Sequence, residues 1–510
     1  MQEITENPSG DPEAFRADLS NDGLKAEEAA QDARQTAENF LTRYRDTGTY
    51  SFADIARLCK IAAHTRPEIA QAGIEGLFQH LVERLNDSFE PESCALYDRI
   101  FAQVIEFCRR RPDARALDET LRRFDLCNEA DMLLRKSQLR DRTSREGERQ
   151  RVRKVLLLSR VTLGADVAVT SVMMSALRQS LPQAELVLLG SGKLRQLFGG
   201  DERVRIHEIA YERGGTLIAR LDSWLAVVSA VDDERAGYTE DEMWVIDPDS
   251  RLTQLGLLPV TDGDAGYFFF ESRSYRQSGI SRLSQLTKHW ITQLCGAENH
   301  AFPDVALPAE HQFFGQQMIQ QLRSGGARHV VSVSFGVGGN PRKRMPDPFE
   351  EKLINGLLND ATLVIDQGAS EDERHQISHL VARLRSQGRT VVETDESNIR
   401  AVLAGNMICA DVMTWDGSIG AFAGLIAASD EYVGYDSAGQ HIAAASGIPT
   451  LTVFVNSGSA LFAERWHPHG PGKISVLKVE PSSDGISEEQ MKAVLAEAQK
   501  LHRSLSERTA

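Results

Sequence analysis

The sequence predicts an α/β protein in which two tandem Rossmann-like domains follow an all-helical N-terminal domain. Before about residue 150 the apolar residues recur three and four positions apart, which is the period of amphipathic helices. After residue 153 short apolar runs alternate with helical segments, and this alternation favours parallel sheets covered by helices. The chain has 510 residues, which is too long for a single hydrophobic core, so several domains are expected.

The N-terminal part divides into two segments. Residues 1–25 are polar, with Gly, Pro, Asn and Asp and few apolar anchors, so we expect them to be disordered. Residues 26–150 form the predicted helical domain, and we expect it to pack outside the cleft that the following domains enclose. The helical period is clearest in "FADIARLCKIAAHT", "PEIAQAGIEGLFQHLVERL", "CALYDRIFAQVIEFCRRR" and "LDETLRRFDLCNEADMLL".

Residues 153–310 are predicted to be the first Rossmann-like domain. "KVLLLSRV" has the character of a buried strand, "VAVTSVMMSALRQSLP" of a helix and "AELVLLG" of a second strand. Strand, helix and strand in this order make a βαβ unit, which implies a parallel sheet. "EMWVIDPD" supplies a later strand, and the Pro-rich "NHAFPDVALPAEH" is predicted to be a linker.

Residues 313–485 are predicted to be the second Rossmann-like domain, and residues 486–510 a C-terminal helix. Ligands of open α/β sheets bind outside the carboxyl ends of the strands, so two facing domains would enclose a cleft. The predicted elements include "HVVSVSFGVGG", "FEEKLINGLLN", "ATLVIDQG", "ERHQISHLVARLRSQG", "TVVET", "GAFAGLIAAS", "EYVGYD", "HIAAAS" and "TLTVF".

Composition narrows the classes of function. The net charge of −16 argues against a nucleic-acid partner, because such proteins need a basic face to neutralise phosphates. No signal peptide or membrane-spanning run is visible, and six scattered cysteines without a CxxC pair fit reduced thiols, so a cytoplasmic location is expected. The one basic stretch, Arg135–Lys154, is predicted to be a solvated helix end and linker; contact with anionic lipid headgroups is its second reading.

Two predicted turns at strand ends carry chemistry. In "SRVTLGADVAVTS", Asp166 stands at a helix start, where it is either a functional carboxylate or a helix cap. In "SFGVGGNPRKRMPDPFEEKL", glycines precede the cations at 342–344, which suits a phosphate group. A flexible, solvated loop would explain the sequence of that second turn equally well.

A third turn, "GYDSAGQH", leads into the Ala-rich "HIAAAS". If Ser437, Ala438 and Gly439 open a helix, their N–H groups point into the cleft and favour an anion. Small residues in the following helix allow it to pack close to the sheet. Asp436 beside such an anion would be repelled, so we expect its carboxylate to face hydroxyl groups of the ligand while the turn behind it holds phosphate.

Together the three turns resemble the bacterial heptosyltransferase family (glycosyltransferase family 9), which has the GT-B architecture of two facing Rossmann-like domains. The resemblance rests on Asp436, His441, "AAASG", Pro449 and "TLTVF", and on "LLLSRVTLGADVAV". It implies that Asp166 is the catalytic base, that Lys343 is the donor lysine, and that Glu371 or Glu373 holds the nucleotide ribose. The donor-binding set would be Lys343, Glu371, Glu373, Gly417, Asp436, Ser437, Ala438, Gly439 and His441, with Arg160 and Arg251 on the acceptor side.

The activity that the resemblance implies is transfer of a heptose-like sugar from a nucleotide diphosphate, ADP-linked, to an acceptor hydroxyl. Transfer would invert the anomeric centre and use neither metal nor cofactor. The acceptor would be a saccharide, a lipid-linked saccharide or a protein, in the setting of lipopolysaccharide biosynthesis in the cytoplasm. A peripheral contact with the inner membrane surface would then be the role of the basic stretch.

Three alternatives stay open. Asp247 and Asp249 in "WVIDPD" form a DxD pattern, which metal-dependent glycosyltransferases use to hold a diphosphate. A non-catalytic scaffold that binds a nucleotide sugar would also fit the fused helical domain. A dehydrogenase fits less well, because "GVGG" lacks the full GxGxxG motif and its acidic partner.

Overall fold

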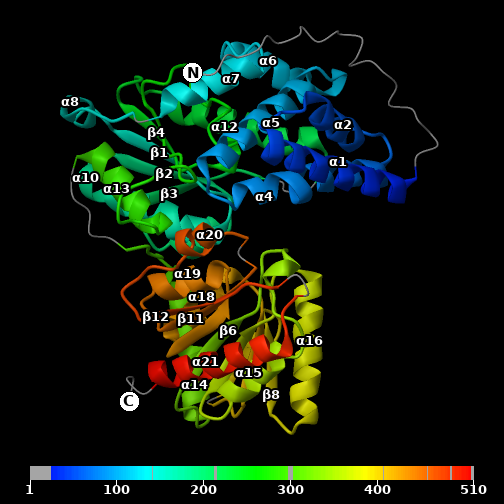
Figure 1. Ribbon diagram of the computed structural model, residues 1–510. Helices are drawn as coiled ribbons and strands as arrows, with labels where there is room; N and C mark the ends of the chain where they lie inside the picture. The colour runs from blue at the N-terminus through cyan, green and yellow to red at the C-terminus, as the bar shows by residue number, and fades with distance from the viewer. Residues whose placement is uncertain are drawn as a thin grey trace.

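The computed structural model describes residues 25–140, 142–211, 215–296, 302–405, 407–456, 458–482 and 485–506. It is a mixed α/β molecule with two parallel sheets, one of five strands and one of seven. In Figure 1 the elements up to α13 form one lobe, and those from α14 to α21 form the other, with α20 at the junction between them. Apart from Lys25, the segment predicted to be disordered lies outside the described residues.

The segment before the first strand contains helices. Breaks fall where the sequence has turn residues: Pro67 and Pro91 each open a helix, and Gly48 closes the first helix in the left-handed conformation. The helical elements are α1 (Ala26–Thr47), α2 (Phe52–Ala62), α3 (Pro67–Glu75), η1 (Gly76–Val82), α4 (Glu83–Asn86), α5 (Pro91–Arg109), η2 (Pro112–Ala114), α6 (Arg115–Arg123), α7 (Glu129–Leu139) and α8 (Glu146–Arg149).

The first sheet has the strand order β3-β2-β1-β4-β5. Its strands are β1 (Lys154–Leu158), β2 (Glu185–Gly190), β3 (Val204–Glu208), β4 (Met243–Asp247) and β5 (Tyr267–Phe269). β1 lies between β2 and β4, with Lys154 opposite Glu185 on one side and Met243 on the other. This order matches the first five positions of the Rossmann arrangement, in which the strand order reverses beside β1.

Helices cover both faces of this sheet. They are α9 (Leu163–Ala165), η3 (Asp166–Thr170), α10 (Ser171–Ser180), α11 (Leu194–Phe198), α12 (Leu217–Arg235), η4 (Arg251–Thr253) and α13 (Leu283–Cys295). Leu156 and Leu158 belong to one buried cluster with α12 and the N-terminal helices. Val155 and Leu157 point the opposite way, into a cluster with α10 and α13. The N-terminal helices therefore share a core with the first sheet, and the domain boundary at residue 150 stays a prediction.

The second sheet has the order β12-β11-β10-β6-β7-β9-β8. Its strands are β6 (Val330–Ser334), β7 (Thr362–Asp366), β8 (Val391–Asp395), β9 (Val412–Asp416), β10 (Glu431–Tyr435), β11 (Thr450–Val455) and β12 (Ile474–Val479). The order reverses between β6 and β10, where Val331 lies opposite Glu431. The prediction of two separate parallel sheets is confirmed.

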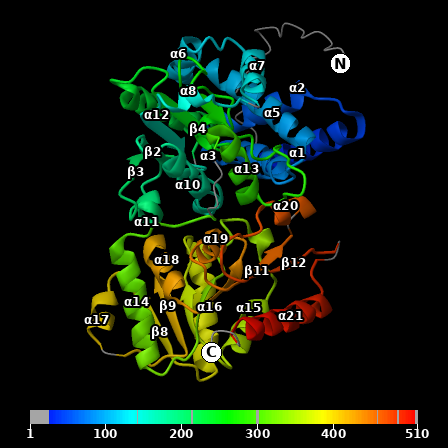
Figure 2. The ribbon, with the colours of Figure 1, turned by 90° about the vertical axis from the view of Figure 1, so that its left-hand side faces the viewer.

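The helices of the second lobe form two layers around its sheet. They are α14 (Ala309–Ser324), η5 (Pro341–Lys343), α15 (Phe349–Leu357), α16 (Glu371–Ser386), α17 (Ile399–Ala404), α18 (Ile419–Ala428), α19 (Ala438–Ala445), α20 (Ala460–Arg465) and α21 (Glu488–Ser506). α14 crosses α18 so closely that a Cβ on Gly315 would come within 2.0 Å of the Gly424 carbonyl oxygen. Figure 2 shows α14 and α18 side by side, with α21 on the other side of the lobe.

The connection between α4 and α5 joins the two lobes. Phe89 is 2% exposed, and its ring centroid lies 6.2 Å from that of Phe462 and 6.4 Å from that of Trp466, on or just after α20 of the second lobe. The Ser459 hydroxyl donates a hydrogen bond to the Ser88 carbonyl oxygen at 3.5 Å. The N-terminal helical segment thus reaches between the lobes, whereas the sequence was interpreted as placing it outside the cleft.

The basic stretch 135–154 is more buried than the sequence predicts. Lys136 is 2% exposed and donates to Asp98 at 2.6 Å. The Arg135 guanidinium donates to Asp264, and Lys154 donates to Glu234. These three cations hold α7 and β1 to their neighbours, so the interpretation as a wholly solvated linker is wrong for them. They are not exposed for contact with lipid headgroups.

Two further observations concern the whole described chain. All six cysteines are free thiols. Within the described ranges, every helix is too short or too polar to cross a membrane.

Glu234 on α12 contacts two cationic side chains and one histidine of the first sheet. Its carboxylate accepts hydrogen bonds from Lys154 at 2.9 Å and from Arg205 at 2.6 Å, and it lies 2.7 Å from Nδ1 of His207. The hydrogen bond from Arg205 is the largest influence. Together with Lys154 and His207 it outweighs burial and holds the pKa of Glu234 well below its usual range.

We expect Glu234→Gln to lower the free energy of unfolding at pH 7 by about 2 kcal/mol, since charged hydrogen bonds of this kind are lost. A depressed pKa stabilises the folded state above the unfolded-state pKa of about 4.3, and this contribution disappears as the pH falls through the folded value. The difference between wild type and variant should therefore shrink below about pH 4. Urea unfolding at several pH values measures it, and a difference that grows in acid would contradict the assignment.

Candidate functional site

The two points at which the strand orders reverse lie at the junction of the lobes. In the first sheet the loops after β1 and β4 flank this point, and in the second sheet the loops after β6 and β10 do. Such switch points are where open α/β sheets bind ligands. A Cβ on Gly164, after β1, would come within 3.2 Å of Ala438 Cα and of His441 Cδ2, after β10. The turn after β1 is therefore in direct contact with the start of α19. Figure 1 shows α19 on the side of the second lobe that faces the first lobe.

Asp166 begins the π-helical turn η3 and is 1% exposed. One carboxylate oxygen accepts hydrogen bonds from the Arg160 backbone N–H at 2.7 Å and the Thr170 hydroxyl at 2.8 Å, and the other accepts from the Ser159 hydroxyl at 2.8 Å. Burial raises the pKa of Asp166 to about 6, and these hydrogen bonds limit the rise. The carboxylate braces the turn after β1, and its pKa suits proton transfer near neutral pH.

Arg160 reaches from this turn to the loop after β4. It donates to the Pro248 carbonyl oxygen at 2.7 Å and to the Ser272 hydroxyl at 2.5 Å. Its guanidinium also lies 5.9 Å from the centroid of the Trp466 ring, in the second lobe. Arg160 thus links both switch-point loops of the first sheet to the opposite lobe.

Hydrogen-bond donors of the protein itself occupy the two carboxylates of the DxD pair at the end of β4. Asp247 is fully buried and accepts from the Ser250 N–H at 2.7 Å and from the hydroxyls of Thr253 and Tyr267. Asp249 is 1% exposed and accepts from the Arg273 guanidinium at 3.1 Å. Both carboxylates brace the loop that they begin, which speaks against the metal-dependent alternative based on this motif.

Lys343 and Asp436 meet beside the second switch point. Lys343 Nζ donates to Asp436 Oδ2 at 2.8 Å, and the Gln440 amide donates to Asp436 Oδ1 at 2.7 Å. Burial lowers the pKa of Lys343, but the Asp436 carboxylate, with Asp87 and Glu83 farther off, outweighs burial and leaves the pKa above its usual value. Lys343 is therefore a cation at neutral pH, and Asp436 holds it in place. The sequence had not indicated this pairing.

The start of α19 is tightly packed. Ser437 is its N-cap and makes no side-chain cap hydrogen bond. A Cβ on Gly439 would come within 2.3 Å of the Tyr432 hydroxyl, so this glycine is required by the ring below it. His441 is 4% exposed, and burial lowers its pKa to about 4, which makes it neutral at physiological pH. Its ring lies edge-on to Trp466 at 6.0 Å.

The other residues that were predicted to bind the donor lie farther from the Lys343–Asp436 pair, toward the β8 side of the second sheet. Glu373 caps α16: its carboxylate accepts from the backbone N–H groups of Val337, Ala369 and Ser370 at 2.9 to 3.2 Å. Glu371 is exposed in the first turn of the same helix. Gly417 follows β9, which lies three strands from β10, or about 14 Å at ordinary strand spacing. Glu373 shapes the glycine loop after β6, and Gly417 is outside the group around Asp436.

Arg251 lines a cavity of about 190 Å³ between the N-terminal helices and the first sheet. Arg220, Tyr97 and Glu83 also line it. Arg220 Nε is buried without a hydrogen-bond partner, and its guanidinium lies 4.2 Å from the centroid of the Phe78 ring. The cavity therefore presents cationic groups in partly apolar surroundings.

Asp87 is subject to the charges of both Lys343 and the cavity residue Arg251. Burial raises the pKa of Asp87, while the charges of Lys343 and Arg251 lower it, so both cations act on the same carboxyl group. Asp87 lies just after α4, more than 250 residues from Lys343 in the chain. The sequence gave no signal for it, because an acidic residue at the end of a helical segment is ordinary.

Comparisons with known proteins give structural matches. No family model matches the chain, and no curated protein sequence matches it significantly. The chain is similar to the glycosyl transferase family 9 structure from Veillonella parvula DSM 2008, at 13% identity and a TM-score of 0.48, over 69% of this chain and 97% of that one.

Two E. coli structures show the same kind of likeness. Heptosyltransferase WaaC with ADP matches at 13% identity and a TM-score of 0.43, over 68% of this chain and 99% of that one. The ADP-heptose lps heptosyltransferase II matches at 15% identity and a TM-score of 0.42, over 70% and 100%. The family whose motifs the sequence resembles thus recurs among the solved structures to which the chain is similar.

Proposed function

We propose that the chain is a glycosyltransferase that moves a sugar from a nucleotide diphosphate to an acceptor hydroxyl at the junction of the two lobes. One observation carries the proposal: the turn that bears Asp166 lies against the start of α19, beside the Lys343–Asp436 pair. A carboxylate with a raised pKa and a held cation on opposite sides of one junction are the groups that such a transfer needs.

In the proposed reaction the acceptor oxygen forms a bond to the anomeric carbon while the bond from that carbon to the diphosphate oxygen breaks. Asp166 takes the acceptor proton, exchanging the hydrogen bond from Ser159 or Thr170 for one from the acceptor. Lys343 and the N–H groups at the start of α19 stabilise the negative charge on the leaving diphosphate. Attack opposite the leaving group inverts the anomeric centre, and no metal is assigned a role.

The donor in this proposal is an ADP-linked, heptose-like sugar, as the family resemblance implies. The cavity beside Arg251 and Arg220 is proposed for the acceptor, and its cations favour an acceptor that carries an anionic group. Saccharide, lipid-linked saccharide and protein acceptors all fit this description, and a saccharide of lipopolysaccharide biosynthesis is the one that the resemblance favours.

A non-catalytic scaffold that binds the same nucleotide sugar is the second candidate. It is favoured by the closed surroundings of Asp166, which is 1% exposed and accepts three hydrogen bonds. The two candidates differ in turnover: an enzyme releases the free nucleotide diphosphate in the presence of acceptor, or slowly with water, and a scaffold does not.

We expect Lys343→Met to weaken binding of both ADP and an ADP-sugar by about ten- to a hundredfold, because a charged hydrogen bond contributes about 1.5 to 3 kcal/mol. Asp436→Asn should weaken both ligands less, since the lysine would stay charged but lose its anchor. Calorimetric titration of the purified protein with ADP, ADP-glucose, UDP-glucose and GDP-mannose measures these affinities and ranks the nucleotides.

Arg342→Met is the matched control, because Arg342 is the adjacent cation and its side chain is exposed. It should change the affinity little. Equal affinity of wild type and Lys343→Met for every nucleotide tested would remove Lys343 from the donor site, and absence of binding by wild type to all four ligands would contradict the proposed function.

A further inference from the structure

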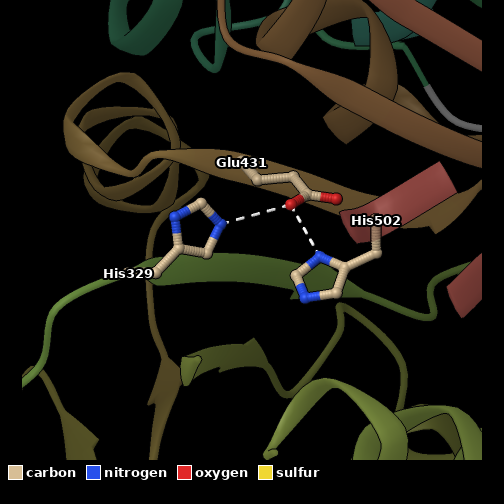
Figure 3. A group of neighbouring side chains, drawn as sticks. All are labelled: His329, Glu431 and His502. Atoms are coloured by element: carbon tan, nitrogen blue, oxygen red, sulfur yellow. Dashed lines mark hydrogen bonds and ion pairs between the residues drawn. The ribbon is translucent and has the colours of Figure 1, made fainter. Parts of the chain in front are cut away.

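Two histidines and a glutamate converge at the amino ends of two central strands of the second sheet, at the end opposite the candidate functional site. His329 directly precedes β6, Glu431 opens β10, and His502 lies on α21. Figure 3 shows both imidazole rings directed at one carboxylate. His502 Nδ1 lies 2.7 Å and His329 Nε2 lies 3.3 Å from Glu431 Oε2. These positions are at the amino ends of the strands, away from Lys343 and Asp436.

Glu431 and His502 are buried, and one carboxylate oxygen of this cluster has no hydrogen-bond partner. Glu431 is 0% exposed and His502 2% exposed. The second carboxylate oxygen of Glu431, Oε1, is buried without a hydrogen-bond partner. Buried carboxylate oxygens nearly always have a partner, so a network of hydrogen bonds alone leaves this atom unexplained. An additional positive ligand within the group would satisfy it.

The outer nitrogen of each histidine faces a carboxylate. His502 Nε2 lies 2.9 Å from Asp360 Oδ1, and His329 Nδ1 lies 4.0 Å from Asp430 Oδ2. Asp430 is itself held by the Val330 N–H and by Arg323. Carboxylates behind histidines are the usual arrangement around bound metal ions, because they fix the ring and direct its other nitrogen at the metal.

We propose that His329 Nε2, the Glu431 carboxylate and His502 Nδ1 bind a divalent transition-metal ion of the zinc class. The inward atoms of the three side chains all lie within 4.8 Å of one another. A tetrahedral ion at about 2.05 Å from its ligands separates them by about 3.4 Å. The His329–Glu431 distance of 3.3 Å already fits, and the His502–Glu431 distance of 2.7 Å needs to open by about 0.7 Å.

The bound ion would fasten α21 to the sheet. His502 lies near the end of this C-terminal helix, whereas His329 directly precedes, and Glu431 opens, one of two adjacent central strands. Binding of the folded state alone stabilises it by mass action, so the ion should raise the melting temperature. The site is independent of the proposed sugar transfer, and its function would be structural.

The test uses the full chain with His375 and His379 both replaced by alanine. These exposed histidines are one helical turn apart on α16 and can bind zinc on their own. In this background we expect Zn²⁺ titration by calorimetry to give one tight equivalent and Zn²⁺ to raise Tm. His502→Gln should weaken the affinity by more than about a hundredfold and abolish the Tm shift. Asp360→Asn should weaken it about ten- to a hundredfold.

Asp360→Asn keeps the assignment testable if His502→Gln does not fold, because the Asp360 side chain is half exposed and leaves all three ligands in place. Co²⁺ gives a second readout, since its visible spectrum separates nitrogen and oxygen ligands from the thiolates of exposed Cys127 and Cys409. Absence of a tight equivalent in the double-alanine background, thiolate-type Co²⁺ spectra, or an affinity unchanged in Asp360→Asn would each overturn the proposal.

Discussion

Asp166→Asn should lower the rate of sugar transfer by about 10²- to 10⁴-fold, the usual contribution of a general base, and leave donor affinity unchanged. Asparagine preserves the shape of the side chain, and its carbonyl oxygen still accepts from the Arg160 N–H and the Thr170 hydroxyl. It cannot accept the acceptor proton. Single-turnover transfer with the donor identified by titration, at saturating acceptor, measures the loss.

The pH dependence gives an independent readout of the same residue. The base must be ionised, and burial raises the pKa of Asp166 to about 6, so the rate should fall as the pH drops below that value. Ser159→Ala removes a hydrogen bond to the ionised carboxylate and should move this midpoint upward by about one pH unit. Turnover that Asp166→Asn leaves intact, or a midpoint that Ser159→Ala leaves in place, would show that Asp166 only braces its turn.

Asp249→Ala should lower the free energy of unfolding by about 3 to 5 kcal/mol, because it leaves a buried cation without its main partner. Arg273 is 1% exposed and donates to Asp249 at 3.1 Å, and Asp98 is farther from it, at 3.6 Å. Asp249 and Arg273 belong to the loops after β4 and β5, and Asp98 belongs to α5, so the loss loosens the contact between the helices and the sheet. Urea unfolding at pH 7 measures it.

Asp241→Ala is the control for this substitution, since Asp241 pairs with Arg151 on the surface and both side chains are about half exposed. It should change stability far less. The DxD reading makes the opposite prediction for Asp249→Ala: stability would be retained, and manganese-dependent binding of the nucleotide sugar would be lost. That pattern would restore the metal-dependent alternative.

The elements that the sequence predicted are those with long, uninterrupted signals. β1, β2 and β6 are buried on both faces, and their apolar runs were recognised from composition. β3 and β12 were not predicted because they lie at sheet edges: β3 mixes buried and exposed side chains, and most side chains of β12 are only half buried. α12 was not predicted from the sequence, because the buried face of this helix includes the charged Glu234, and a charged residue there blurs the apolar stripe.

The candidate site was predictable as far as local motifs reach. The turns at Asp166, Lys343 and Asp436 follow strands whose carboxyl ends could be located from the pattern. The pairing of Lys343 with Asp436 spans 93 residues, and the contact of Gly164 with Ala438 crosses between lobes, so neither has a local signature. The burial of Lys136 and Asp249 could not be predicted for the same reason. Each charge is neutralised by a residue from a distant element, and such partners are invisible in one sequence.

The ring of Phe89 has a mechanical consequence for the junction of the two lobes. A rotation that separates α20 from the N-terminal helices must withdraw this side chain from Phe462 and Trp466. Exposing a buried phenylalanine costs about 1.5 to 3 kcal/mol, which makes the parted arrangement roughly ten- to a hundredfold rarer than in a two-lobed protein without such a contact. The helical segment that carries Phe89 therefore opposes separation of the two lobes, which the proposed entry and release of a ligand at their junction would require.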